Sequence, residues 1–474
     1  MCQLSNYAQS LVLDYSRSMS MITKNLIKIF ILFIAIVLIV LSLRSCRKTD
    51  FTIIEDGDFL IVPLVKKLAI KSVRRPVAAG VYDEKVNKTF VSYMGKGSNP
   101  FVQSFNHSDN TWSPAQQVAD IKKSKYFEAV DRHDYPSLLE MDNGKLAVFY
   151  AVHAKELRMS VSAKAGSSKG KWKDRVIKEA AFAAYPMPLK TENGDIYVFY
   201  RESSFSMHSG LERDDRPLQY IVSTNNGKSW LKSSEISGEE IALGSWQRDD
   251  NLDEIYLGQI RYQPAEDNVS ERFHLVWTIS GGGFEGPKHD RYHKDVYYAF
   301  FLPSNKHFYS VDGEDLGFSI NAAEMKNCLV FDSGKLDANN PKSIGYSLLL
   351  SWTEDSKPLL VYEINKEGQI WLGSSTWSGT TWQQSSIPSN NSIMDLEKLD
   401  KDSFALYLGN GKIYTSHDAA KNWNYATTLR LPDNKKIAKL ALIDNYKDPA
   451  RFIVSERLSD DKAKRDIFLV GFAR

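Results

Sequence analysis

Two histidines, a tyrosine and an arginine stand at the ends of hydrophobic, strand-like segments, where they could transfer protons and bind an anion. His133 lies just before one such segment, and His153 lies just after the next one. Tyr185 opens the following pair of segments, and Arg201 ends it. Histidine and tyrosine serve as general acids and bases, and arginine suits a carboxylate or a sulfate. These four residues therefore predict a site for proton transfer on an anionic ligand.

The four residues lie within or next to two copies of an internal repeat. Segments 135–150 and 185–200 align without gaps, each with Tyr-Pro, a hydrophobic run, an Asn-Gly turn and a second run ending in Val-Phe-Tyr. Hydrophobic runs on both sides of Asn-Gly predict a β-hairpin. Three of the four candidates have an unrelated partner in this alignment: His133 with Ala183, His153 with Ser203, and Arg201 with Ala151. Because a hairpin brings the start of its first strand beside the end of its second, we expect the four residues on one rim.

Tyr135 and Arg132 flank His133 and are candidates for substrate binding on that rim. Tyr135 matches Tyr185 in the alignment, so the tyrosine at this position also fits a packing role.

The fourth repeat unit adds further candidates. Its first strand is expected to carry Tyr256 and, along the same stretch, Arg261 and Tyr262. A long loop after its second strand contains His289 and His293. Long loops beside a rigid scaffold often line binding sites. We expect all five residues on the rim of the four candidates above.

Two eight-residue motifs indicate the fold. Segments 223–230 and 416–423 resemble the Asp-box, Ser-x-Asp-x-Gly-x-x-Trp, of sialidase-type propellers. Asn225 replaces the aspartate in the first copy, and Ala420 replaces the glycine in the second. In such a motif the polar residues close a turn and the tryptophan packs between sheets, so we expect a structural role on the face opposite the candidate site.

Short segments rich in Val, Ile, Tyr, Phe and Trp, separated by turn residues, recur along the chain beyond residue 50. They form seven units, at 72–120, 131–178, 182–238, 251–316, 343–390, 391–433 and 435–474. Units of this length suit four-stranded blades. The sequence thus predicts an all-β fold, a seven-bladed β-propeller with degenerate Asp-box (BNR) repeats, over residues 51–474. The last unit is one strand short, and segment 51–63 is expected to close the ring.

Composition narrows the class of protein. With 43% hydrophobic residues in 474, the chain can bury a large core. The 60 basic and 58 acidic residues nearly balance, and no long block of one sign indicates nucleic-acid binding. Cys328 is the only cysteine beyond Cys46, so neither a disulfide framework nor a paired-cysteine metal site is expected. We expect no cofactor, and no metal ligands can be assigned.

The N-terminus indicates export. Residues 29–43 are uncharged and mostly apolar, and Lys24 and Lys28 precede them. This run is shorter than the about 20 residues of a full membrane span and fits a signal peptide, with an uncleaved membrane anchor as the alternative. Segment 43–46 loosely resembles a lipobox ending at Cys46. We expect residues 1–46 to form an N-terminal extension with this signal or anchor, and the protein to be secreted, periplasmic or held at the cell surface.

The residue types at the rim favour one reaction class. Glycoside hydrolysis commonly needs two carboxylic acids at a defined separation, whereas this rim is basic and phenolic. β-Elimination at a uronic acid suits it better. Arginine would neutralise the sugar carboxylate and acidify the adjacent C5 proton, a histidine or tyrosine would remove that proton, and a partner would protonate the leaving O4.

At these residues the chain resembles the ulvan lyases of polysaccharide lyase families 24 and 25, which are BNR-repeat propellers. The resemblance covers residues 75–317. It is carried by these motifs: His133-Asp-Tyr-Pro, Tyr150-Ala-Val-His153, Tyr185-Pro-Met-Pro, Val198-Phe-Tyr-Arg201, Tyr256, Val296-Tyr-Tyr-Ala299 and Phe308-Tyr309.

The resemblance implies β-eliminative cleavage of a sulfated, uronic-acid-containing polysaccharide. It further implies that His133 and Tyr185 form the base and acid pair, with either as the base. His153 and Tyr256 would support proton transfer, and Arg201 would neutralise the carboxylate. The Asp-Gly-His-Pro-like stretch expected before Val296 is replaced by residues 282–295.

Two alternatives stay open at this point. A sialidase-like glycoside hydrolase fits the Asp-boxes but needs three arginines and a Tyr/Glu pair that the sequence does not supply convincingly. A non-catalytic, glycan-binding propeller at the cell surface would bind the polysaccharide without turnover. The sequence leaves open the uronate epimer and whether cleavage is endo or exo.

Overall fold

The computed structural model describes residues 53–69, 79–123, 135–151, 153–203, 215–245, 248–266, 268–459 and 464–473. The chain divides into two compact units, Met1–Asp50 and Phe51–Arg474, and all described residues belong to the second. The expected signal or anchor in residues 1–46, with Cys46, lies outside the described residues. Within the described ranges, no helix is long and apolar enough to cross a membrane.

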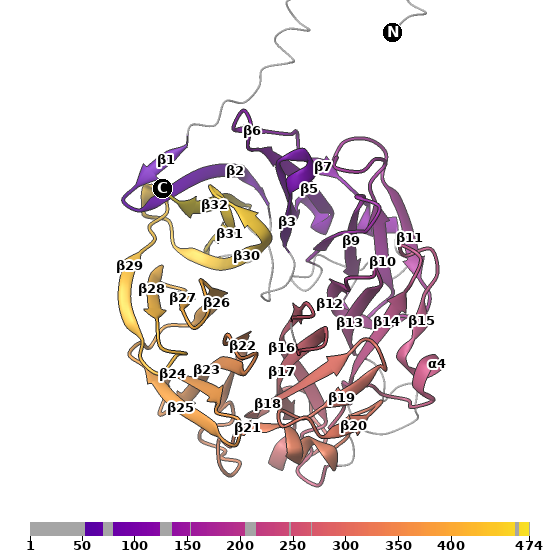
Figure 1. Cartoon of the computed structure of the whole chain (residues 1–474), viewed down its shortest axis with the longest axis vertical. Coiled ribbons are helices and arrows are strands. Elements are labelled where there is room, and N and C mark those ends of the chain that lie inside the picture. The colour runs from indigo at the N-terminus through magenta and orange to yellow at the C-terminus, as the bar shows by residue number, and fades with distance from the viewer. Residues whose placement is uncertain are drawn as a thin grey trace, which may run out of the picture. The chain divides into compact units, whose positions relative to one another are not determined.

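The unit Phe51–Arg474 is a seven-bladed β-propeller, as the sequence predicts, and Figure 1 shows its sheets set around a common centre. Blades 1 to 3 contain the strands β3 (Gly80–Asp83), β4 (Lys88–Met94), β5 (Pro100–Asn106), β6 (Thr111–Trp112) and β7 (Gln116–Gln117); β8 (Ser137–Glu140), β9 (Leu146–Ala151), β10 (Leu157–Val161) and β11 (Lys173–Ile177); and β12 (Ala183–Lys190), β13 (Ile196–Glu202), β14 (Leu218–Ser223) and β15 (Leu231–Lys232).

Blades 4 to 6 continue the pattern, with extra strands in blade 4. They contain β16 (Glu254–Gln263), β17 (Arg272–Gly281), β18 (Tyr292–Leu302), β19 (His307–Tyr309), β20 (Asp315–Gly317) and β21 (Leu329–Phe331); β22 (Ile344–Trp352), β23 (Pro358–Lys366), β24 (Gln369–Trp377) and β25 (Trp382–Ile387); and β26 (Ile393–Lys398), β27 (Phe404–Leu408), β28 (Lys412–Ser416) and β29 (Asn424–Thr428). The sequence unit 251–316 did not include β21, which pairs with β18.

Blade 7 joins the two ends of the propeller. It consists of β30 (Ile437–Lys447), β31 (Ala450–Glu456), β32 (Arg465–Phe472) and the N-terminal strand β2 (Phe59–Ala69), with β1 (Ile54–Asp56) on its edge. β2 pairs antiparallel with β32, from Phe59 opposite Phe472 onward. In Figure 1 the indigo β2 accordingly runs beside the yellow β32. This pairing covers the edge of β32, which would otherwise be exposed for association with other chains.

Helical segments among the described residues are short. They are α4 (Ser233–Ser237) and the 3₁₀ segments η2 (Glu84–Val86), η3 (Lys96–Ser98), η4 (Ile121–Lys123), η5 (Gly283–Glu285), η6 (Glu324–Cys328) and η7 (Pro432–Asn434).

The two aligned hairpins have the same register. Ser137 lies opposite Phe149 in blade 2, and Met187 lies opposite Phe199 in blade 3. Gly144 has a φ of 71°, in the left-handed region where glycine is favoured. The gap-free alignment therefore corresponds to a real structural equivalence.

Both Asp-boxes close turns, as expected. In the first, the Ser223 hydroxyl accepts a bond from the Gly227 N–H, and Asn225 accepts one from the Ser229 N–H. Trp230 is 7% exposed and packs at its edge against Phe149 of the neighbouring blade. The box thus fastens two blades together.

Buried aromatic rings fill the space between blades 3 and 4. Phe199 of blade 3 contacts Phe273 and Phe301 of blade 4, and Tyr220 of blade 3 contacts Phe301, at centroid distances between 5.2 and 5.9 Å and edge to face. All four are buried. Edge-to-face aromatic pairs add to the free energy gained by burying their surface, so this layer fixes the relative positions of the blades that carry Arg201 and Tyr256.

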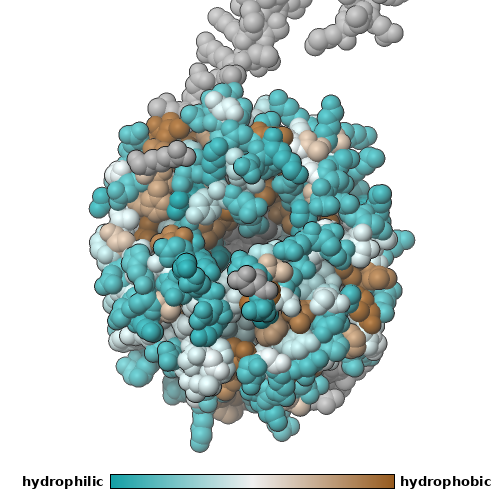
Figure 2. All heavy atoms as spheres, viewed as in Figure 1, coloured by the Kyte–Doolittle hydropathy of each residue, from teal (hydrophilic) through white to brown (hydrophobic). Residues whose placement is uncertain are grey.

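Successive hairpins give the propeller two distinct faces. The first strands of blades 3, 4 and 6 begin at Ala183, Glu254 and Ile393 on what we call the Glu254 face. They end at the hairpin turns on the opposite side, the hairpin face. Figure 2 shows a hollow in the middle of the ring with hydrophilic residues around it.

Candidate active site

Arg201 is the centre of the site on the Glu254 face. It lies near the end of β13 and is 3% exposed. Its guanidinium carbon lies 4.8 Å from the ring centre of Tyr185 and 4.8 Å from that of Tyr256. Each such contact contributes about 0.5–2 kcal/mol. The two aromatic rings thus lie against the buried cation.

Arg201 keeps one donor that is unused among the described residues. Nε donates to the Ser203 hydroxyl at 3.4 Å, a side-chain hydrogen bond joins Arg201 to Tyr256, and Nη1 has no hydrogen-bond partner among the described residues. Burial lowers the pKa of Arg201, but the phenols of Tyr185 and Tyr256 and the Glu254 carboxylate outweigh this effect and raise it. A buried cation with a free donor is suited to a carboxylate, which can accept two parallel bonds from a guanidinium.

Tyr185 occupies a strained position. Its φ of 58° lies in the left-handed region, which aromatic residues rarely adopt. The register between β12 and β13 shifts between Ala184 and Met187, so Tyr185 lies in a bulge. Such strain costs about 1–3 kcal/mol and concentrates at functional sites. The bulge directs the ring toward Arg201 and out of the regular alternation of the strand.

His153 and Tyr135 also lie against Tyr185. The His153 ring centre is 6.1 Å from that of Tyr185, and the Tyr135 ring stacks at 6.3 Å. His153 is half-buried and follows β9, whereas Tyr135 is fully buried. Blades 2 and 3 thus bring these residues to one rim, as the repeat alignment predicts.

His293 supports Tyr256 from blade 4. Its ring centre lies 4.7 Å from that of Tyr256, and the imidazole is fully buried. Nε2 is 2.5 Å from Asp290 Oδ1, and burial lowers the pKa of His293 although this bond opposes the shift. Tyr346 of blade 5 packs against both rings and donates its hydroxyl to Asp290 at 3.0 Å. Tyr256 is therefore fixed by residues of two blades.

Asp290 is the acidic residue among His293, Tyr346 and Lys342. Burial raises its pKa, but the bonds from His293 and Lys342 outweigh burial, so the pKa lies below its usual value. Lys342 Nζ lies 3.1 Å from Asp290 Oδ1. An ionised Asp290 can thus hold His293, Tyr346 and Lys342 together.

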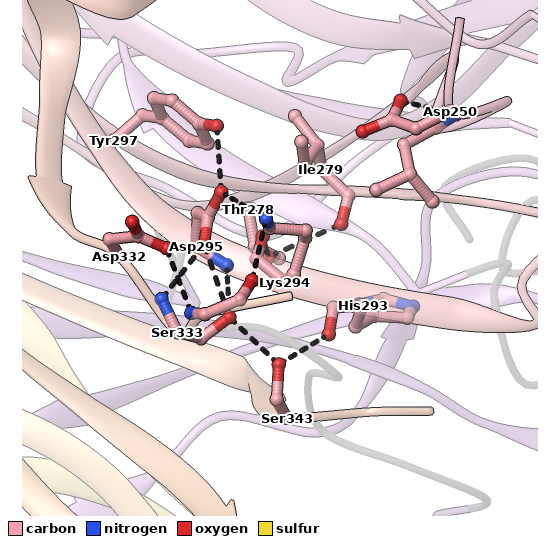
Figure 3. Close-up of polar contacts among 12 residues, drawn as sticks. Asp250, Thr278, Ile279, His293, Lys294, Asp295, Tyr297, Asp332, Ser333 and Ser343 are labelled. Atoms are coloured by element: carbon pink, nitrogen blue, oxygen red, sulfur yellow. Dashed lines mark hydrogen bonds and ion pairs between the residues drawn. The ribbon is translucent and has the colours of Figure 1, made fainter. Parts of the chain in front are cut away.

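Figure 3 shows how the backbone of His293 is fixed. Ser343 Oγ lies 3.0 Å from the His293 carbonyl oxygen and 2.9 Å from Ser333 Oγ, so its single hydrogen can be donated to either. The Asp295 carboxylate accepts bonds from both the Ser333 hydroxyl and the Tyr297 hydroxyl. This network ties the start of β18 to the end of β21 and the start of β22, so the loop before β18 is firmly attached to the scaffold.

Glu254 is a buried acid that the sequence analysis did not single out. Its Oε2 lies 2.7 Å from His289 Nδ1 and 3.7 Å from Arg216 Nε, and its Oε1 accepts the Asp290 N–H at 3.0 Å. Glu254 lies two residues before Tyr256, on the same side of β16. The alternation of side chains along this strand could have pointed to Glu254 from the sequence, because Tyr256 was already a candidate. No sequence signal pointed to Tyr346 or Lys342, because blade 5 carries no motif that aligns with the earlier blades.

The expectation that Arg261 and Tyr262 share this rim is wrong. They lie near the far end of β16, because the strand runs from one face of the propeller to the other. Arg261 donates to the Leu396 carbonyl at 2.8 Å, and the Tyr262 hydroxyl donates to Glu271. Both line a cavity of about 510 Å³ at the hairpin face. The assignment of Arg261 and Tyr262 to substrate binding stays a prediction, and they do not lie at the site around Arg201.

Arg132 and His133 lie outside the described residues. Within the described ranges, no three His, Cys, Asp or Glu side chains gather closely enough to hold a metal ion. The described part of the site is thus a row of rings and charges: His153, Tyr185, Arg201, Tyr256 and His293, with Glu254 and His289 alongside. Such a set can bind a carboxylate and move protons beside it.

Comparison with known proteins supports the resemblance to ulvan lyases. An ulvan lyase of Alteromonas sp. (strain LOR) is 24% identical over 86% of this chain and 87% of its own length. An ulvan lyase-PL25 of Pseudoalteromonas sp. (strain PLSV) is 23% identical over 83% of this chain and 82% of its own.

Solved structures give the same result for the fold. A PL25 ulvan lyase bound to -[GlcA(1-4)Rha3S]- superposes with a TM-score of 0.63 at 19% identity, over 86% of this chain and 96% of that one. A family model described as "BNR repeat-containing family member" matches residues 88–390, well over half of the chain. The chain belongs to the BNR repeat-containing family.

Proposed function

We propose that this protein is a polysaccharide lyase that cleaves a sulfated, uronic-acid-containing polysaccharide, of the ulvan type, by β-elimination. The observation that carries the proposal is the buried Arg201, which contacts the rings of Tyr185 and Tyr256 and has Nη1 unpartnered among the described residues. The ulvan lyases that align with most of this chain give the substrate class.

Arg201 would bind the uronate carboxylate. Pairing with a cation withdraws electron density from the carboxylate and stabilises the enolate-like charge that forms when the C5 proton leaves. Because the site is buried, this electrostatic stabilisation is stronger than it would be in water. The described residues thus supply the electrophilic part of the reaction.

The elimination needs one base and one acid. The base removes the C5 proton, the electron pair of the C5–H bond forms the C4=C5 double bond, and the C4–O bond breaks. The electron pair of that bond stays on the leaving oxygen, which the acid protonates. We assign Tyr185 and His133 to this pair, with His153 beside Tyr185 to assist proton transfer and Tyr256 to orient Arg201.

Glu254 bears on the sialidase alternative. A sialidase needs an acidic group that activates a nucleophilic tyrosine, and Glu254 is the buried acid near Tyr256. Its two oxygens already contact His289, Arg216 and the Asp290 amide. This engagement favours a role in fixing the loop over one in nucleophilic catalysis.

Absorbance near 235 nm tests the proposal. The unsaturated uronate absorbs there, so incubation with ulvan should raise the absorbance, whereas hydrolysis or simple binding would not. Release of sialic acid from sialosides, or binding of ulvan without absorbance change at any pH, would contradict the lyase assignment.

We infer export from the N-terminal sequence alone. Residues 29–43 supply an apolar segment behind Lys24 and Lys28. The protein should appear outside the cytoplasm on cell fractionation, and Cys46→Ser should release it from the membrane if that cysteine carries lipid. Recovery of the full-length chain in the cytosol would contradict export.

A further inference from the structure

A second cavity, with a volume of about 560 Å³, lies between blades 6 and 7. Its walls come from the start of β26, the end of β27, the end of β29 and the start of β30. Ile393 and Glu254 are each the first residue of the first strand in their blade. The cavity therefore opens on the Glu254 face, the same face as Arg201, but three blades away from the strand that carries it.

The charge of this cavity is its distinguishing feature. Four cationic residues line it, Arg430, Lys435, Lys436 and Arg457, and no aspartate or glutamate is among its lining residues. Lys435 is neutralised by Glu456 at 3.0 Å and Asp466 at 3.4 Å. The other three are exposed and have no ion pair with a described residue. Three uncompensated cations in one hollow create a positive potential.

The scaffold keeps the hollow open. Gly409 lies beneath Arg457, with the site of a Cβ 3.9 Å from the guanidinium and 2.7 Å from Met394 Cε, so a larger residue would collide there. The Arg457 N–H donates to the Lys436 carbonyl at 2.6 Å and ties β31 to the loop before β30. Amide side chains of Asn390, Asn391 and Asn410 also line the cavity and can bond to hydroxyl groups.

The cavity at the hairpin face makes an informative contrast. It is lined by Glu140, Asp395, Glu397 and Asp444 together with three basic residues. A polyanion would be repelled by those carboxylates but attracted by the cavity between blades 6 and 7. Among the described residues, the Glu254 face thus carries both Arg201 and a cavity whose charged lining residues are all cationic.

We propose that the cavity of Arg430, Lys436 and Arg457 is an ancillary site for sulfate or carboxylate groups of a long polysaccharide, distant from the reacting uronate. This inference rests on the proposed function for its ligand class. A chain held at both places dissociates more slowly than one held at Arg201 alone, because the second contact forms at high effective concentration. The site should therefore matter for polymers and not for short oligosaccharides.

The test compares two triple variants with the unaltered protein. The site variant is Arg430→Ala, Lys436→Ala and Arg457→Ala. The control, Lys169→Ala, Lys171→Ala and Lys173→Ala, removes three exposed cations before and at the start of β11 on the hairpin face, so the change in net charge is equal. Binding is measured by affinity electrophoresis in dextran sulfate, which contains no uronate and cannot be cleaved. Turnover is measured at 235 nm with ulvan polymer and with a tetrasaccharide prepared from it.

For the site variant we expect dextran sulfate binding to weaken about tenfold, given modest contributions from three exposed ion pairs. The KM for polymer should rise by a similar factor, with kcat and all tetrasaccharide kinetics unchanged, which also shows that the variant is folded. Unchanged binding by the site variant, or equal loss in the control, would overturn the inference.

The outcomes also separate the two proposals. Weaker dextran sulfate binding in the site variant, with no turnover of any uronate polymer by the unaltered protein, would refute the lyase activity and support the anion site. Normal turnover of polymer with unaltered binding and KM in the site variant would refute the anion site and support the lyase.

Discussion

The guanidinium carbon of Arg201 lies 4.8 Å from the ring centre of Tyr185 and at the same distance from that of Tyr256. The cation and the phenol that we assign to proton transfer are thus in direct contact. In the proposed reaction Arg201 binds the carboxylate and the neighbouring Tyr185 takes part in proton transfer. Substitutions at the two positions should therefore have different kinetic signatures.

Arg201→Lys should lower kcat by about 10²- to 10³-fold, the usual effect of removing one electrostatic contact to the transition state. The ammonium keeps the charge but loses the planar fork that binds a carboxylate through two bonds. Steady-state kinetics at 235 nm measure the effect, and thermal unfolding followed by circular dichroism serves as the folding control. A variant with near-normal kcat would refute the role of Arg201 in the reaction.

Tyr185→Phe should lower kcat by about 10²- to 10⁴-fold, the range for loss of a general acid or base. The ring, and with it the contact to Arg201, is retained, so KM and stability should change little. Tyr135→Phe is the matched control, since Tyr135 occupies the equivalent repeat position and stacks on Tyr185 at 6.3 Å. Equal losses in both variants would indicate a packing effect and contradict the assignment of Tyr185.

The repeat made much of the fold predictable. A gap-free alignment gives the register of a hairpin directly, because the side-chain alternation of strands leaves little freedom. The pairs Ser137 with Phe149 and Met187 with Phe199 bear this out. Ring closure by β2 was predictable from a missing strand. Even the Asp-box that lacks its glycine keeps the turn, with Ala420 at a φ of 64°.

The site was less predictable than the fold, for two physical reasons. A strand in a propeller spans both faces, and the distance from Tyr256 to Arg261 is about 16 Å at 3.3 Å per residue. Closeness in sequence therefore misplaced Arg261. The contact of His293 with Tyr346 joins two blades through a loop whose conformation includes a left-handed Asp290. Hydrophobic periodicity contains no information on such contacts.

Acid should destabilise the protein through His274. This fully buried ring contacts the Tyr298 hydroxyl at 2.6 Å and Gln263 Oε1 at 2.8 Å. Burial lowers the pKa of His274 to about 3, whereas an unfolded histidine titrates near 6.5. The unfolded state therefore binds the proton first as pH falls. The contribution of His274 to the free energy of unfolding is complete above about pH 6.5 and declines by about 1.4 kcal/mol per pH unit below that value.

His274→Gln removes this titration. At pH 8 the variant should be less stable than the unaltered protein, because the paired imidazole is lost. The difference in free energy of unfolding between His274→Gln and the unaltered protein should shrink by about 3 kcal/mol between pH 6.5 and pH 4. Guanidinium unfolding at pH 8, 6.5, 5 and 4 measures it. A difference independent of pH would show that His274 does not titrate in this way.

Gly227→Ala should destabilise the blade 2–blade 3 contact by about 2–3 kcal/mol. Gly227 has a φ of 70°, and left-handed backbone costs a residue with a Cβ about 1–2 kcal/mol. An added Cβ would also lie 2.9 Å from Met159 Cε in the neighbouring blade, and overpacking adds about 1 kcal/mol or more.

Gly238→Ala is the matched control, because Gly238 has a φ of 77° but no atom within 4 Å of an added Cβ. It should incur only the backbone cost. The shift in guanidinium midpoint should therefore be larger for Gly227→Ala, and Met159→Ala should narrow the difference by removing the colliding methyl group. Equal shifts for the two glycine variants would mean that Met159 moves away freely, and that the Asp-box does not fasten the two blades through this contact.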